Sequence, residues 1–205
     1  MKKMIDLTYT ITDMLPVYPL DDPISLKQIR SLKTDHYNDW ELKTGMHVGT
    51  HIDGPGHLTN SSVLLSDMPL NNFIGKGFLI DARNKPIDES LLQSMPTEEN
   101  LIVLILTSFD KQFGSDAYFN NHPIFTKEFA EKLVETKIKM VGIDFFSPDH
   151  YPFDIHKIFF KHDILIIENL RNLEQLIDAK KFTVVALPLK TATDSAPARV
   201  IALLE

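Results

Sequence analysis

The chain has 205 residues, a length typical of one compact domain, and we expect residues 1–205 to fold as a single unit. Hydrophobic residues make up 43% and charged residues 24%, which excludes a disordered or fibrous protein. The net charge of −7 argues against nucleic acid as a partner, because phosphate binding requires an excess of basic residues. The chain has no cysteine, so its chemistry must rely on histidine, carboxylates, hydroxyls or a metal with nitrogen and oxygen ligands.

No apolar run approaches the roughly 18 residues of a membrane span, and Asp6 and Asp13 interrupt the segment where a signal-peptide core would lie. We therefore expect a cytoplasmic protein without a membrane partner. The chain also lacks a G-x-S-x-G elbow and a Walker A loop, so neither a serine hydrolase of that type nor ATP binding is indicated.

Strand-like and helix-like segments alternate after residue 70, which predicts the α/β class with a mixed central β-sheet and flanking helices. The strand-like runs are short, apolar and β-branched, as in strands covered on both faces. In chain order the expected elements are a strand at 78–80, a helix at 88–95, a strand at 101–106, a helix at 126–136, strands at 140–146 and 164–167, a helix beginning near 172 and a strand at 184–187.

Two of these helices have a recognisable inward face. Thr126 is placed to cap the first of them, because a threonine side chain at that position can accept a hydrogen bond from the first turn. The side chains expected to face inward are Phe129, Leu133 and Val134 in the first helix and Leu173, Leu176 and Ile177 in the second.

The segment 47–57, HVGTHIDGPGH, contains three of the eight histidines. Side chains alternate along an extended chain, so His47, His51 and Asp53 share one face. A helix would also align the two histidines, but Gly49 and the Gly-Pro-Gly turn at 54–56 disfavour it. Because His47 and His51 would lie about 13 Å apart on a straight strand, a bend at Gly49 would help them to reach one ion.

These residue types indicate a metal site. Neutral imidazoles and a carboxylate suit Zn²⁺ or a similar divalent ion, and an aspartate can bridge two ions with its two oxygens. His57 follows the turn, where it can act as a general acid/base beside the metal without being a ligand. Three histidines and an aspartate in one pattern make an incidental polar loop the less favoured interpretation.

The segment 47–57 matches every fixed position of H-x-G-T-H-x-D-x-P-x-H, the hallmark of the bacterial kynurenine formamidases and related cyclase-like metal-dependent hydrolases. Further blocks are similar to this family: DLTYTITDMLPVYP near the start, GIDFFSPDHYPFDIHKIFFKHDILIIENL from residue 142, and ALPLKTATDSAPARVIALL at the end. The resemblance covers nearly the whole chain. It implies the swivelling β/β/α type of fold, with a mixed sheet and flanking helices.

The resemblance also implies a pair of divalent ions, with Zn²⁺ expected and Mn²⁺ as the alternative. In the family, the residues that match His47, His51 and Asp53 hold the first ion, and the aspartate bridges. A later histidine and glutamate twelve residues apart complete the second site, and His156 and Glu168 have that spacing. His150 and His162 are alternative ligands near His156, and Asp194 is either an orienting residue behind the ligands or a turn residue.

The activity implied by the resemblance is hydrolysis of a small amide, with N-formyl-L-kynurenine of tryptophan catabolism as the leading substrate. The residue expected to line the substrate pocket is Tyr18, but Leu20 stands where the family commonly has glycine, which leaves the substrate open. One alternative is a non-catalytic binding protein stabilised by a structural metal. The other is a lyase or cyclase that uses His57 as a base on carbon.

Aromatic pairs suggest how the protein assembles. Phe145–Phe146 and Phe159–Phe160 exceed what a small pocket needs, and we expect one pair to contact a partner subunit in a homodimer or larger homo-oligomer. The alternative is that both pairs pack in the core.

Overall fold

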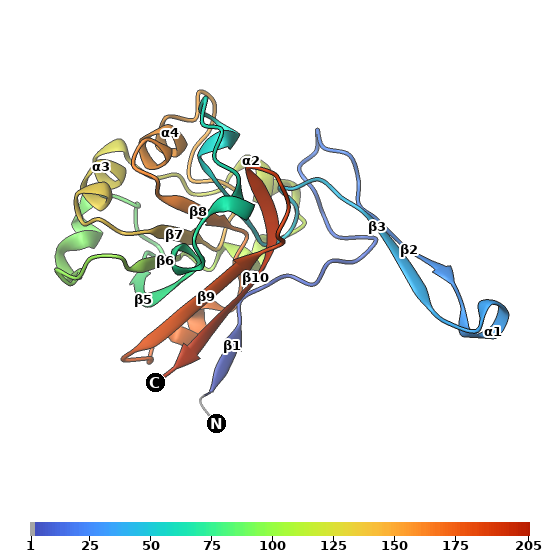
Figure 1. Ribbon diagram of the computed structural model, residues 1–205. Coiled ribbons are helices and arrows are strands. Elements are labelled where there is room, and N and C mark those ends of the chain that lie inside the picture. Colours follow the sequence, from blue (N-terminus) through green and yellow to red (C-terminus); the bar gives the residue numbers. More distant parts are fainter. Residues whose placement is uncertain (1–2) are drawn as a thin grey trace.

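The computed structural model describes residues 3–205 (Figure 1). Eight strands form one sheet in this part of the chain, and two further strands form a separate hairpin. The strands are β1 (Met4–Asp6), β2 (Ser25–Arg30), β3 (Asp39–Lys43), β4 (His51–Asp53), β5 (Ile74–Asp81), β6 (Ile102–Leu106), β7 (Met140–Ile143), β8 (Leu165–Glu168), β9 (Phe182–Pro188) and β10 (Ser195–Leu204).

The sheet is mixed, as the sequence predicts. Its strand order is β1-β10-β4-β8-β7-β6-β5-β9, and β10 also pairs with β9, so the sheet closes into a barrel-like ring with β1 on the outside. Strands β5, β6, β7 and β8 run parallel, whereas β4, β9 and β10 join by antiparallel pairing. The ends of the described chain lie together on the side where β1, β9 and β10 extend beyond the ring (Figure 1).

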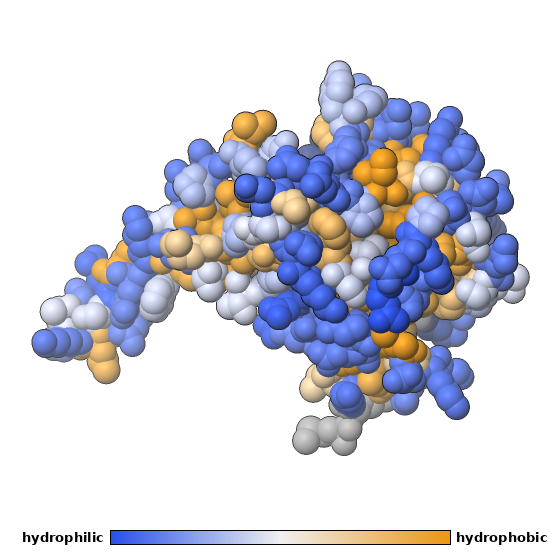
Figure 2. Space-filling model, turned by 180° about the vertical axis from the view of Figure 1, so that it is seen from behind, coloured by the Kyte–Doolittle hydropathy of each residue, from blue (hydrophilic) through white to orange (hydrophobic). Residues whose placement is uncertain are grey.

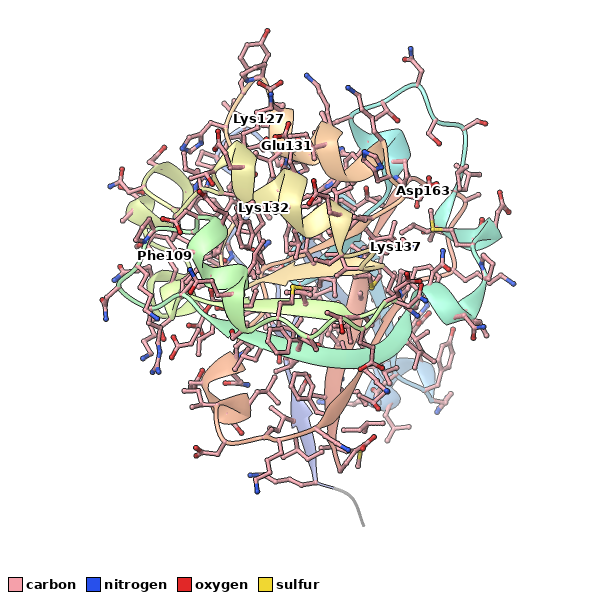
Figure 3. The ribbon with its side chains drawn as sticks, turned by 90° about the vertical axis from the view of Figure 1, so that its left-hand side faces the viewer. Phe109, Lys127, Glu131, Lys132, Lys137 and Asp163 are labelled. Carbon is pink, nitrogen blue, oxygen red and sulfur yellow. The ribbon has the colours of Figure 1, made fainter. Side chains whose placement is uncertain are left out.

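The α-helices are α1 (Leu32–Asp35), α2 (Asp116–Asn120), α3 (Lys127–Glu135) and α4 (Asp154–Phe160). Helices α3 and α4 cover the parallel strands on the outside of the ring, whereas α1 lies at the tip of the β2–β3 hairpin (Figure 1). Figure 3 shows α3 over the sheet, with Lys127 and Glu131 on its outer face, where their charged atoms are 3.5 Å apart. The Thr126 side chain accepts a hydrogen bond from the Phe129 N–H, which confirms the predicted cap. No helix within residues 3–205 has the length and apolarity that crossing a membrane requires.

Some predicted boundaries were wrong. The segment 88–95 is a 3-10 helix at Glu89–Ser94, and the segment near residue 172 is a 3-10 helix at Leu173–Leu176 that leaves Ile177 43% exposed. Strand β7 ends at Ile143, earlier than predicted, because Asp144 turns away and accepts hydrogen bonds from backbone N–H groups beyond β6.

The parallel strands separate two apolar cores. Along β6, Ile102, Leu104 and Leu106 face the inside of the ring, whereas Val103 and Ile105 face α3 and α4. All five side chains are fully buried, and each such burial contributes about 1.5–3 kcal/mol. This explains why the strand is a continuous apolar run.

The aromatic pairs belong to the molecule itself. Phe145 and Phe159 are fully buried, and Phe160 is 3% exposed in the core beneath the helices. Phe146 stacks on Tyr18, with ring centroids 5.1 Å apart. The prediction that one of these pairs contacts a partner subunit was therefore wrong, and the core-packing alternative is correct for Phe145, Phe159 and Phe160.

Candidate metal centre

Two short strands bring distant residues together at this site. In the antiparallel pair of β4 and β8, His51 lies opposite Glu168, and Ile52 lies opposite Ile167. The two isoleucines point into the ring core, so His51, Asp53 and Glu168 point to the other face, toward α4. All three are buried. The alternation predicted from sequence therefore applies to His51 and Asp53.

The chain bends at Gly49 before entering β4. Gly49 has φ +58°, a left-handed conformation that favours glycine, and residues 47–50 lie outside the strand. Its carbonyl oxygen accepts hydrogen bonds from the His51 Nδ1–H at 2.8 Å and from the Asn169 side-chain amide at 3.0 Å. The bend fixes the His51 ring so that Nε2 faces the carboxylates.

The donor atoms form a set that fits a divalent ion. His51 Nε2 lies 3.4 Å from Asp53 Oδ1 and 3.4 Å from Glu168 Oε2. Within residues 3–205, His51 Nε2, Asp53 Oδ1 and Glu168 Oε1 are buried without a hydrogen-bond partner. Such atoms are costly to bury unless something else binds them. Imidazole and carboxylate ligands in this arrangement match the requirements of Zn²⁺ or Mn²⁺.

His156 approaches the same carboxylate from α4. Its Nε2 lies 3.4 Å from Glu168 Oε1, and its Nδ1 lies 2.6 Å from Asp149 Oδ1. The other oxygen of Asp149 accepts a hydrogen bond from the Ile155 N–H at the start of the helix. Asp149 therefore fixes both the first turn of α4 and the orientation of the His156 ring.

His47 and His57 occupy the solvent side of Asp53. His47 Nδ1 lies 2.8 Å from Asp53 Oδ1, and its ring centroid is 4.1 Å from that of His57. His57 ends a 3-10 helix at Pro55–His57 that the Gly-Pro-Gly turn begins. This turn packs closely against the start of β10, because a Cβ on Gly54 would lie 2.6 Å from the Asp194 carbonyl oxygen.

The buried charges shift several pKa values. Burial opposes a charge on His51, but the Asp53 and Glu168 carboxylates outweigh it and raise its pKa to about 9. Burial likewise opposes a charge on His156, but the carboxylates of Asp149 and Glu168 outweigh it and raise its pKa to about 10. Burial lowers the pKa of His57, against the attraction of Asp53. Without a metal, the carboxylates therefore hold protons on His51 and His156, whereas His57 stays neutral at pH 7.

A cavity of about 410 Å³ opens beside these residues, a size suited to a small molecule. None of the described residues that line it is lysine or arginine. Besides the proposed ligands and His57, seven residues with aromatic side chains line it: Tyr18, Phe119, His122, Phe146, His150, Tyr151 and Phe153.

The structure brings most of the sequence-predicted residues to this cavity. Those that line it are Tyr18, His47, Asp53, His57, His150, His156 and Glu168, with His51 directly behind Asp53 and Glu168. The His150 ring packs against His122 at 4.5 Å rather than against Glu168, which His156 contacts. His162 is exposed and does not line the cavity. Asp194 contributes its backbone carbonyl to the Gly54 N–H, as a turn residue does.

Two residues were not identified from the sequence. Asp149 orients His156, and Asn169 joins the end of β8 to the bend at Gly49 and also accepts a hydrogen bond from the Tyr118 hydroxyl at 2.7 Å. Both lie in the block from residue 142, and Asn169 directly follows Glu168. Their closeness in sequence to the proposed ligands was the one signal available for finding them. Their hydrogen-bond partners, however, are determined only by the tertiary structure.

Comparisons with known proteins identify the family of the chain. The family model described as "Putative cyclase" matches residues 5–150. An uncharacterized protein of Methanocaldococcus jannaschii is 34% identical and covers 98% of this chain and 100% of its own. A kynurenine formamidase of Bacillus cereus is 29% identical and covers 96% of this chain and 95% of its own.

Solved structures share the fold. Isatin hydrolase A from Ralstonia solanacearum has a TM-score of 0.88 at 22% identity, covering 99% of this chain and 92% of its own. A structure described as a potential metal-dependent hydrolase with cyclase activity has a TM-score of 0.81 at 25% identity, covering 100% of this chain and 99% of its own. The chain belongs to the cyclase family and is a metal-dependent hydrolase.

Proposed function

We propose that the protein, as one domain over residues 1–205, hydrolyses a small N-acyl amide on an aryl group, with N-formyl-L-kynurenine as the leading substrate. The observation that carries the proposal is the convergence of His51, Asp53 and Glu168 beside a cavity that several aromatic side chains line. The similarity to kynurenine formamidases over nearly the full chain supports the formamide. This assignment would place the enzyme in tryptophan catabolism, in the cytoplasm.

The proposed ligands are His47, His51, Asp53, His156 and Glu168, with Asp53 between two divalent ions, in the first place Zn²⁺. Two overlapping groups of donors support a pair of ions: His51, Asp53 and Glu168 form one, and Asp53 also belongs to a second group with His47 and His57. When bound, such ions would lower the pKa of water far below its ordinary value, toward about 7, and would polarise the substrate carbonyl.

His57 is the proposed acid/base. Its ring lies next to that of His47 and 6.2 Å from that of His156, on the open side of the cluster. Its lowered pKa leaves the imidazole neutral at pH 7, so it can accept the proton of the attacking water. It then donates that proton to the leaving nitrogen, which departs as a neutral amine.

The aromatic side chains that line the cavity favour an aryl substrate. Tyr18 and Phe146 stack with their planes 8° apart, and Phe119 meets both rings edge-on. A flat aryl group would pack against these rings and place its amide toward the metal ligands. The absence of lysine and arginine from the described lining leaves a substrate carboxylate without a fixed cationic partner there, so neutral formanilides should also be accepted.

Isatin is the second candidate substrate, because it is a neutral cyclic aryl amide and the fold matches that of isatin hydrolases. A non-catalytic metal-stabilised protein is less favoured, because His57 on the open side of the cluster would then have no role. A lyase or cyclase on the same scaffold would use His57 to remove a proton from a carbon atom. Its product would then lack the free carboxylate that hydrolysis of the acyl group produces.

The test is hydrolysis of a substrate panel by protein loaded with Zn²⁺ or Mn²⁺, with release of formate measured directly. Formanilide and N-formylkynurenine should be cleaved, and chelation should abolish the rate. If isatin is cleaved but neither formamide is, the proposed substrate is wrong, whereas the proposed reaction, hydrolysis of an amide, still holds. No hydrolysis by protein shown to contain metal would favour the binding protein.

A further inference from the structure

A buried hydrogen-bond network joins helix α2 to the candidate metal centre. The Tyr118 hydroxyl donates to Asn169 Oδ1 at 2.7 Å, and the Asn169 side-chain amide donates to the Gly49 carbonyl oxygen at 3.0 Å. The same carbonyl oxygen accepts a hydrogen bond from the His51 Nδ1–H at 2.8 Å. Tyr118 is fully buried, and Asn169 and His51 are also buried, so each of these polar groups depends on its partner in the network.

The Gly49 carbonyl fixes the direction of every hydrogen bond in this network. A carbonyl oxygen only accepts, and its two lone pairs allow two donors. The Asn169 atom that faces it must therefore be the amide nitrogen, which leaves Oδ1 toward Tyr118 and makes the hydroxyl the donor. By the same argument, a singly protonated His51 carries its proton on Nδ1. Its Nε2, which faces the two carboxylates of the proposed site, then has a lone pair free for a metal.

Asn169 is suited to the centre of this network by its backbone. It has φ +56°, in the left-handed region that asparagine tolerates better than most residues. Its N–H donates to the Phe145 carbonyl at 3.1 Å, and its carbonyl accepts from the Thr50 hydroxyl at 2.6 Å. The backbone and side-chain polar groups of Asn169 are therefore all bonded, and two of these bonds join it to the bend at Gly49 and Thr50. A buried network in which each group has a partner is rigid.

The Tyr118 hydroxyl serves this network and nothing else in the described chain. Its bond to Asn169 is the one hydrogen bond that it makes within residues 3–205. The Tyr118 ring contacts Phe109 and Phe113, with ring centroids 5.8 and 5.1 Å away, and a phenylalanine would make the same contacts. Because a buried hydroxyl without a partner costs free energy, packing alone would favour phenylalanine at this position.

Helix α2 also forms part of the cavity wall. Phe119, the residue after Tyr118, lines the cavity and meets Phe146 edge-on, with ring centroids 5.3 Å apart. Tyr118 and Asn169 are not among the described residues that line the cavity. Neighbouring residues of α2 therefore lie toward different parts of the site: Phe119 faces the space proposed for the substrate, and Tyr118 faces the support of a metal ligand.

We propose that Tyr118 and Asn169 are positioning residues for the metal. Through the Gly49 carbonyl they hold the His51 ring with Nε2 toward the other ligands, and neither residue touches the metal or the substrate. Without the Tyr118 hydroxyl, the Asn169 amide is free to rotate, so the Gly49 carbonyl and the His51 ring are held less firmly. This inference rests on the ligands of the proposed function and does not depend on which substrate the cavity takes.

The primary test compares the Zn²⁺ affinity of Tyr118→Phe with those of the wild type and of Tyr9→Phe, by competition with a chelating dye. Tyr9→Phe is the matched control, because the Tyr9 hydroxyl also donates one hydrogen bond, to the Asp110 carbonyl at 3.0 Å, outside the network. Tyr118→Phe should bind Zn²⁺ about fivefold more weakly, the factor that one ordinary hydrogen bond represents. Tyr9→Phe should bind as the wild type does.

The melting temperature of the metal-free variants separates positioning from folding. Each of Tyr118→Phe and Tyr9→Phe loses one hydrogen bond, so both should melt slightly below the wild type. A purely structural role of Tyr118 would lower its melting temperature and leave its Zn²⁺ affinity unchanged, which would overturn the proposal. Tyr37→Phe is the surface control, because Tyr37 is 54% exposed in the hairpin that projects from the body (Figure 2), and it should match the wild type in both measurements.

A double-mutant cycle tests whether the two residues act in series. Asn169→Gly suits the left-handed backbone and removes the amide, so Zn²⁺ affinity should fall about 10- to 100-fold. Adding Tyr118→Phe to Asn169→Gly should cause no further loss, because the hydroxyl then has nothing left to orient. A further fivefold loss would overturn the proposal. If Asn169→Gly does not fold, the comparison of Tyr118→Phe with Tyr9→Phe decides alone.

Failure of this inference can be told apart from failure of the proposed metal site. A wild type that binds no Zn²⁺ would refute the proposed ligands and the positioning role together. Equal Zn²⁺ affinities of the wild type and Tyr118→Phe would refute the positioning role of Tyr118 and leave the ligands in place.

Discussion

His51 and Glu168 are direct partners across the antiparallel pair of β4 and β8, although 117 positions separate them in the sequence. Their side chains share a face because opposite residues in a β-ladder do, and their nearest charged atoms are 3.4 Å apart. The backbone hydrogen bonds of two strands thus bring a proposed ligand of the histidine motif to a proposed ligand from the second half of the chain. Rigid strands hold such a pair more accurately than loops would.

Removing the charge of Glu168 should release metal without breaking the ladder. Glu168→Gln keeps the size of the side chain and the strand pairing but offers a neutral oxygen, which is a weaker ligand for a divalent ion. Metal content by elemental analysis should fall by at least half, with an unchanged circular dichroism spectrum. Glu98→Gln, on the surface, is the control. Full metal content in Glu168→Gln would remove Glu168 from the site.

Replacing His57 separates catalysis from metal binding. His57→Ala should keep the metal content and thermal stability of the wild type and lower turnover by about 10²- to 10⁴-fold, the usual contribution of a general acid/base. The wild-type rate should rise with pH through an inflection at or below about 6.5, because burial lowers the pKa of His57 from that ordinary value. The variant should lack this inflection. Unchanged turnover would make His57 a bystander, and loss of metal would make it a ligand.

Asp149 should act through His156. Asp149→Asn retains the shape of the side chain but loses the charge that holds a proton on His156 Nδ1, so Nε2 is less firmly directed at Glu168. We expect metal affinity to fall about 10- to 100-fold in a competition titration with a chelating dye. Asp154→Asn, an exposed change in the first turn of α4, should have no effect. Equal affinities in the two variants would mean that Asp149 has only a structural role.

Metal binding should displace protons. His51 and His156 have pKa values raised to about 9 and about 10, so both are protonated at pH 7 in the metal-free protein and must lose those protons to act as ligands. Calorimetric titration with Zn²⁺ at pH 7 in buffers of different ionisation enthalpy should therefore report release of about two protons per chain. If no protons are released at pH 7, His51 and His156 are already neutral in the metal-free protein.

The same shifts set the pH dependence of stability without metal. Because the folded pKa values lie above the unfolded value of about 6.5, the stabilisation is complete below pH 6.5 and is lost as pH rises through about 9 to 10. The melting temperature of the chelated protein should fall over this range, and His51→Phe should weaken the fall. A melting temperature that rises from pH 7 to 10 would contradict these charge states.

Sequence alone placed His51 and Asp53 on one face, because they alternate with Ile52 along one short strand. His156 and Glu168 were proposed only from the twelve-residue spacing that the family resemblance implies, because no local pattern connects them to His51. Asp149 and Asn169 could not be predicted, because each acts through a hydrogen bond to a residue whose position depends on the fold: His156 Nδ1 for the first, and the Gly49 carbonyl for the second.

The parts of the fold that were mispredicted share a physical cause. One of the pairs Phe145–Phe146 and Phe159–Phe160 was expected at a subunit surface, because a sequence does not reveal which face of a helix or sheet is covered. Phe159 lies on the buried face of α4, and it shares one core with Phe145. The hairpin of β2 and β3 was not predicted at all. Trp40 and Leu42 alternate with charged residues as in any half-buried strand, and this pattern does not reveal that both side chains stay exposed outside the two cores.

We propose that a metal held by His47, His51, Asp53, His156 and Glu168 makes this protein an amide hydrolase. This is tested by the rate of formanilide hydrolysis by chelated protein as Zn²⁺ or Mn²⁺ is added back, with bound metal quantified in the same samples. The stripped protein should be inactive, activity should rise with bound metal and saturate at about two ions per chain, and His51→Ala should show no such recovery. Hydrolysis that survives complete removal of metal would contradict it.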